Sequence, residues 1–146
     1  MRKMLIILSL ALLVTGAAAK EPETLEQLKA RTEATTGARK ALLYAEVVQR
    51  EIEIANQLFT GGEAEKAHAL VREAVGYAEK ARDSVREHPR RIKDTEIALR
   101  KAEHRLNDIR RTLALEDQPD VQAAVDQIAA IRKQLLDLLF APRHQR

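Results

Sequence analysis

The sequence contains no cysteine and no tryptophan, and its aromatic residues are only two tyrosines and two phenylalanines. Without cysteine the chain can form no disulfide framework, no thiolate nucleophile and no covalent c-type haem link. So few aromatic side chains do not predict a stacking surface for sugars or for nucleic-acid bases. Ser84 lies outside any nucleophile-elbow pattern, and there is no glycine-rich phosphate loop. We therefore expect no catalysis and no cofactor.

The first nineteen residues have the pattern of a secretory signal peptide. Arg2 and Lys3 give a positive start, residues 4–14 form an apolar run that is too short to span a bilayer, and residues 17–19 are small alanines. We expect residues 1–19 to be cleaved, which makes the mature protein periplasmic or secreted. Because no cysteine follows the cleavage site, we expect neither a lipid anchor nor stable membrane insertion after cleavage.

The charge balance gives no support for an anionic partner. The chain carries 25 Lys and Arg against 22 Asp and Glu, a formal net charge of +3, and cleavage would remove Arg2 and Lys3 to leave +1. A nearly neutral mature chain gives no support for binding to nucleic acid. The remaining length is that of one ordinary domain, which can bury enough surface to fold without a disulfide or a metal.

Glycine and proline divide the main part of the chain, residues 38–140, into four segments. The breaks are Gly61–Gly62, Pro89 and the polar stretch 116–120. Strong helix formers fill the segments, and apolar residues recur every three or four positions, as in a coiled coil; the last such stripe runs to Leu138. Helices of similar length with short connections predict an all-α fold, an antiparallel up-down-up-down four-helix bundle. Residues 20–37 would be an N-terminal extension, helical or frayed, and residues 141–146 a short polar tail.

The first of the four segments has an unusually wide apolar surface. Leu43, Ile54 and Leu58 extend its apolar arc beyond half of the helix circumference. Such a helix packs against two neighbours or against another chain. We therefore regard these three residues as a candidate surface for self-association or for an unidentified protein partner.

Two charged residues lie among apolar helical neighbours. Glu51 in the first segment and Arg132 in the fourth both have mainly apolar residues three, four and seven positions away. A buried charge is costly unless an opposite charge pairs with it. Since the first and fourth helices would be adjacent in the predicted topology, we expect Glu51 and Arg132 to form a buried ion pair that fixes the packing. The alternative is a ligand site in which a charged group displaces one member.

Metal binding has only a weak signal. Glu65 and His68 have the Glu-x-x-His spacing of di-iron bundles, but those bundles need a second such motif and two more inward glutamates. A haem held by Met and His is not expected, because Met1 and Met4 would leave with the signal. We therefore expect no metal site.

The sequence thus favours an exported helical-bundle protein that acts through protein interaction, as an envelope adaptor, a scaffold or a stress-type binding protein. The alternative is a periplasmic carrier of a small ligand or metal in the bundle core. A carrier requires a cavity with convergent polar groups, whereas an adaptor requires an exposed apolar patch.

Overall fold

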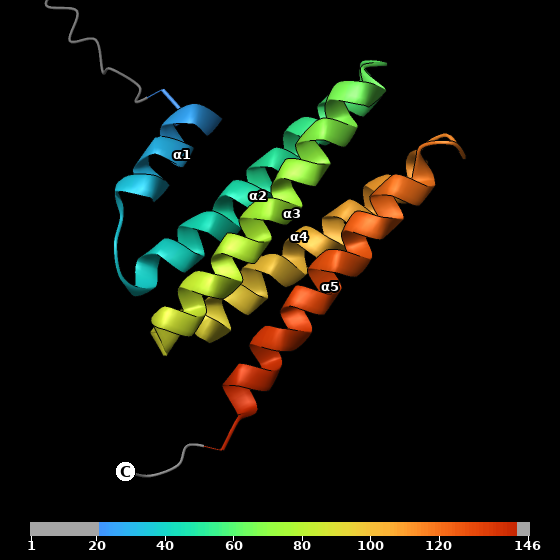
Figure 1. Cartoon of the computed structure of the whole chain (residues 1–146). Helices are drawn as coiled ribbons and strands as arrows, with labels where there is room; N and C mark the ends of the chain where they lie inside the picture. Colours follow the sequence, from blue (N-terminus) through green and yellow to red (C-terminus); the bar gives the residue numbers. More distant parts are fainter. Residues whose placement is uncertain (1–20, 143–146) are drawn as a thin grey trace, which may run out of the picture.

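The computed structural model describes residues 21–142, and every regular element in this range is helical (Figure 1). The prediction of an all-α class is confirmed. The expected signal segment, residues 1–19, lies outside the described residues. None of the helices within 21–142 combines the length and apolar character needed to cross a membrane. The elements are α1 (Leu25–Ala34), α2 (Ala38–Thr60), α3 (Ala64–Glu87), the short 3₁₀ helix η1 (Pro89–Arg91), α4 (Ile92–Thr112) and α5 (Gln118–Phe140).

The turn from α2 to α3 follows from the glycine pair. Gly62 has a φ of 78°, in the left-handed region that glycine adopts without strain. This conformation lets the N–H of Glu63 donate to the carbonyl of Leu58 at 2.9 Å and the N–H of Gly62 donate to that of Phe59 at 3.1 Å. Both bonds belong to the Schellman pattern that ends many helices. The chain reverses at this turn, and α3 runs back along α2.

Small residues determine how closely α2 and α3 approach. These two helices form the most extensive helix pair in the described structure, and α4 with α5 forms the next. Alanine at the contact positions allows two helix backbones to lie close together, while Leu, Ile and Val fill the space between the two pairs. The alanines of α2 and α3 that are fully buried are Ala41, Ala45, Ala67, Ala74, Ala78 and Ala81.

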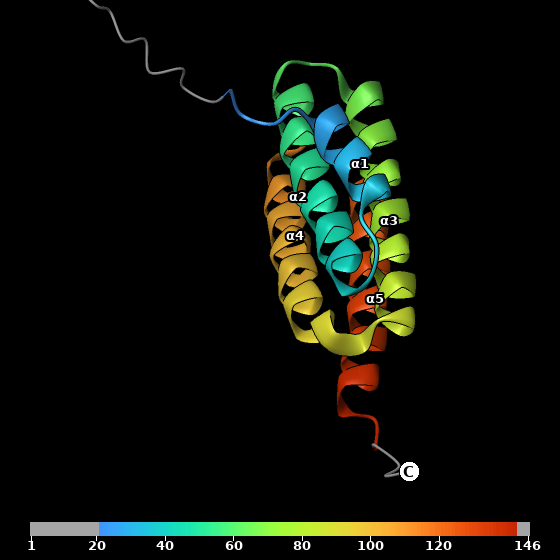
Figure 2. The ribbon, with the colours of Figure 1, turned by 90° about the vertical axis from the view of Figure 1, so that its left-hand side faces the viewer.

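The predicted order of neighbours is wrong in one respect. α2 and α5, which we expected to be adjacent, do not pack against each other, and α3 has little contact with α4. The physical reason is the connection, because η1 packs across the start of α2 and leads the chain to the far side (Figure 2). Two antiparallel pairs therefore face each other, with α2 beside α4 and α3 beside α5.

The N-terminal extension forms a helix of its own, α1. Thr24 caps it: its side chain accepts a hydrogen bond from the N–H of Gln27, whose side chain accepts one from the N–H of Thr24. α1 packs on α2 and lies in front of the α2/α3 pair (Figure 2). Its buried residues are Leu28 and Thr32. The link from α1 to α2 includes Gly37, at a φ of 72°.

Candidate functional site

Glu51, in the middle of α2, is the most unusual side chain of the described structure. It is 0 % exposed, and its carboxylate faces α1, where Lys29 Nζ lies 2.9 Å from Oε1. Lys29 and Glu51 are close enough for an ion pair, but their geometry is not that of a hydrogen bond. Within residues 21–142, neither carboxylate oxygen of Glu51 accepts a hydrogen bond. A buried carboxylate in this state depends on its single cation for compensation.

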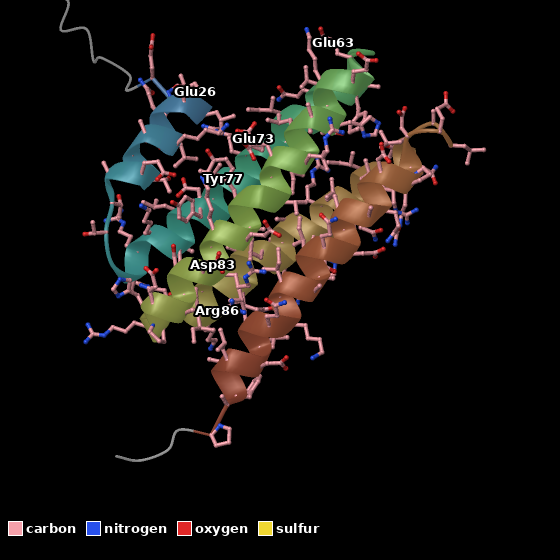
Figure 3. All side chains as sticks on the ribbon, in the orientation of Figure 1. Glu26, Glu63, Glu73, Tyr77, Asp83 and Arg86 are labelled. Carbon is pink, nitrogen blue, oxygen red and sulfur yellow. The ribbon has the colours of Figure 1, made fainter. Side chains whose placement is uncertain are left out.

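Lys29 is held by more than Glu51. Its Nζ also donates to Glu73 Oε1 on α3 at 2.7 Å and lies 5.3 Å from the centre of the Tyr77 ring. Figure 3 shows Glu73 and Tyr77 on the side of α3 that faces α1. Two carboxylates and an aromatic face therefore surround one ammonium group, an arrangement that favours a cation. We call Glu51, Glu73 and Tyr77 the ammonium cage; the Lys29 side chain that fills it is 15 % exposed.

Burial and charge act in opposite directions on these groups. Burial raises the pKa of Glu51 from 4.5 to about 7, although Lys29 pulls it down; Glu73 and Glu26 add to the rise. For Lys29, burial lowers the pKa, but Glu73 and Glu51 outweigh it and the net pKa is raised. Lys29 therefore stays charged at neutral pH, whereas the pKa of Glu51 lies close to neutral pH.

A second group of polar contacts fastens the C-terminal end of α1. The hydroxyl of Tyr44 donates to Glu33 Oε1 at 3.1 Å, and its ring lies 5.9 Å from that of Tyr77. Lys80 Nζ lies 4.7 Å from the centre of the Tyr77 ring and 3.8 Å from Glu33 Oε1. α1 is thus held on α2 and α3 largely by charges and hydroxyl groups, with Leu28 as its one buried large apolar side chain.

Arg132 belongs to a different cluster, so the predicted Glu51–Arg132 pair is wrong. Its guanidinium donates to Glu96 Oε1 at 2.7 and 3.1 Å and to Glu103, both on α4. Burial lowers the pKa of Arg132, but the bonds to Glu103 and Glu96 more than offset this and leave it raised. The error came from the neighbour order, since α5 packs beside α4 and not beside α2.

The sequence held a signal for the Arg132 partners and almost none for those of Glu51. Glu96 and Glu103 are seven positions apart, so they lie on one face of α4. That spacing would have marked them as partners for an inward arginine. Lys29 is one lysine in a short helix whose docking depends on the tertiary fold, and nothing in its spacing identifies Glu51 or Glu73.

His68 has a protein partner. Its Nε2 lies 2.8 Å from Asp117 Oδ1, and its ring meets Phe59 edge-on with the centroids 5.0 Å apart. Glu65, the other weak metal candidate, is exposed on α3. In the described part of the chain, no three His, Cys, Asp or Glu side chains gather in a way that could hold a metal ion. Within residues 21–142, the structure therefore groups no set of metal ligands around Glu65 and His68.

The candidate interaction surface on α2 is largely covered. Leu43 is only 4 % exposed, which corrects its assignment to an exposed patch, and Ile54 and Leu58 are half-buried. The wide apolar arc instead serves three helices, because α2 packs against α1, α3 and α4. The large apolar residues that do remain exposed within 21–142 are Leu115, Leu138 and Phe140.

No protein-family model, no curated protein and no solved structure matches the chain. Function must therefore be argued from the site and the surface.

Proposed function

We propose that this is an exported protein whose helices α2–α5 form a four-helix bundle, with α1 added on one face, and that it acts by binding another protein. On this proposal the chain is an adaptor or scaffold of the cell envelope and carries out no catalysis. The observation that supports it best is the exposed apolar end of α5.

The C-terminal end of α5 carries large apolar residues beyond the helices that could cover them. Leu135 is fully buried, but Leu138 is 38 % and Phe140 77 % exposed, and α5 extends past the ends of its neighbours (Figure 2). The predicted place of Leu138 in the buried stripe is wrong, because α5 extends beyond the ends of its neighbours here. Single exposed apolar residues are ordinary, but exposed large apolar residues at the end of a helix that extends beyond its neighbours are suited to contact with a partner.

Site-specific photo-crosslinking tests this proposal. A photoreactive amino acid at position 140 is expected to give a discrete protein adduct in cells, while the same residue at exposed position 126 of α5 is expected to give none. Phe140→Glu should abolish any association that the purified protein shows in sedimentation. Equal crosslinking at positions 140 and 126, or none at either, would contradict the proposal.

Export has its own test. N-terminal sequencing of the protein from the envelope or the medium is expected to begin at Lys20, since residues 17–19 form the proposed cleavage site. Retention of Met1 in the mature protein would refute export by this route.

A carrier function is the second candidate, and one groove favours it. Between α3 and α5 lies an open groove of about 360 Å³, with Val71, Val75 and Ala124 among its apolar lining and His68 and Arg72 among its polar lining. This volume lies within the range of small-ligand sites. Native mass spectrometry of the purified protein is the test: a bound small molecule that is lost in Arg72→Ala supports a carrier, and a protein free of ligand supports the adaptor.

A further inference from the structure

We propose that the ammonium cage is a docking site for a lysine carried on an amphipathic helix of a partner protein, and that α1 occupies this site in cis. The inference rests on the proposed interaction function, since it names what the partner presents. The docking site lies on a different face from the end of α5, and its test is separate from the crosslinking test at position 140.

The geometry of the cage is specific for an ammonium group. Glu51 and Glu73 come from different helices, yet both approach one Nζ atom, at 2.9 and 2.7 Å, and Tyr77 covers it with its ring. Apolar side chains of similar volume often stabilise a core as well as, or better than, a buried ion pair. Glu51 is therefore poorly explained by stability alone and better explained by selection of the group that docks on α2.

α1 is a short helix whose apolar contact with the rest of the chain is small. It has ten residues, fewer than an isolated helix needs to persist in water, and it buries one large apolar side chain, Leu28. The link to α2 passes through Gly37, whose φ of 72° lies in the left-handed region that glycine adopts without strain. The helix α2 that lies beneath α1 is fixed independently by α3 and α4.

The face of α2 beneath α1 is apolar beside the acidic cage. Leu43 and Val47 are buried, but they do not belong to the core cluster that joins α2, α3, α4 and α5, and α1 packs on the same helix. Without α1, the face would present these apolar residues beside the acidic cage. A helix with a leucine followed directly by a lysine, as in Leu28–Lys29, matches both features.

The partner is expected to be another protein and not a second copy. A second copy supplies the same α1, so exchange would replace the contacts of α1 by identical ones and lose the freedom of two separate molecules. A foreign helix with a further apolar residue beyond the leucine would bury more surface than α1 does. Only such a helix gains by displacing it.

Peptide binding to the full mature chain tests the inference. The probes are two labelled synthetic peptides with the sequence of residues 21–36, one unchanged and one with Lys29→Met. The receptor is the chain with Leu28→Ala, which weakens the cis occupant and leaves every charge in place; Leu115→Ala, at an exposed leucine, is the matched control. Circular dichroism verifies that each variant is folded.

In fluorescence anisotropy, we expect the unchanged peptide to bind the Leu28→Ala chain tighter than the Leu115→Ala chain. It should also bind the Leu28→Ala chain on the order of tenfold tighter than the Lys29→Met peptide, the usual effect of losing a hydrogen bond to a charged group. Adding both Glu51→Gln and Glu73→Gln to the receptor neutralises the two carboxylates that approach Lys29 and should remove most of that difference between the peptides.

Three outcomes would overturn the inference. The two peptides bind equally; or neither binds the folded Leu28→Ala chain at millimolar concentration; or the wild-type chain forms a dimer that Lys29→Met abolishes, which would give the site to a second copy. None of these outcomes affects crosslinking at position 140, so the two proposals fail independently.

Discussion

Glu51→Gln is the perturbation whose effect follows most directly from the structure. The substitution keeps the shape of a side chain that is 0 % exposed and removes its charge. Burial raises the pKa of Glu51 from 4.5 to about 7, with the opposing attraction of Lys29 already included. The free energy of unfolding of the parent must therefore depend on pH in a way that the variant's does not.

The sign and size of this dependence follow from linkage. Below pH 4.5 the carboxyl is protonated in both states, so burial carries no charge penalty. Between about 4.5 and 7 the unfolded chain loses this proton while the folded chain keeps it, so stability falls as the pH rises. Above about 7 both states are ionised and the full penalty is present. A shift of roughly 2.5 pKa units at 1.36 kcal/mol each amounts to about 3 kcal/mol.

Urea unfolding followed by circular dichroism at pH values from 4 to 8 measures this effect. We expect the stability of Glu51→Gln relative to the parent to rise by about 3 kcal/mol over this range. Taking the difference between the two proteins cancels the titration of all other shared groups. Glu79→Gln, at an exposed position of α3, controls for the loss of one negative charge. A difference that stays constant with pH, or that falls as the pH rises, would refute the reasoning.

Two further predictions concern backbone and charge. Gly62→Ala should lower the free energy of unfolding by about 1 kcal/mol, because a Cβ is strained at a φ of 78°. Gly76→Ala, inside α3 with open space around the added Cβ, should raise it by about 1 kcal/mol. Thermal unfolding compares the two variants, and equal effects would contradict this prediction. Arg132→Met should cost about 3 kcal/mol, because two carboxylates of α4 lose their shared partner. In double-mutant cycles, the stability changes of Arg132→Met and Glu96→Gln should be non-additive, whereas those of Arg132→Met and Glu51→Gln should add. Additive changes with Glu96→Gln together with non-additive changes with Glu51→Gln would show that the two clusters are misassigned.

The helices themselves were predictable from local sequence. Gly61–Gly62, Pro89 and Pro119 mark ends or starts of helices, because glycine and proline act on the backbone within a few residues. The three- and four-residue apolar spacing identified the buried faces for the same reason. Both signals are local, and the structure follows both.

The arrangement of the helices was not predictable in the same way. A turn such as that around Pro89 can return the next helix to either side of its predecessor, and the choice depends on how η1 packs against α2. The wrong choice in the sequence interpretation put α5 beside α2 and joined Glu51 to Arg132. The burial of Glu51 was inferred correctly, because it depends on neighbours in the same helix, whereas its partner depends on the topology.

The two charged clusters differ in what they join, and this difference bears on function. Arg132 links α5 to α4 within an extensive helix pair, where many apolar contacts would hold the helices together without it. Lys29 joins a short helix with one buried leucine to a face of α2 and α3. Removing the first cluster changes the stability of the whole core, whereas removing the second changes whether α1 stays docked. The Glu51–Lys29 contact is therefore the position at which a partner can compete with the chain's own helix at small energetic cost.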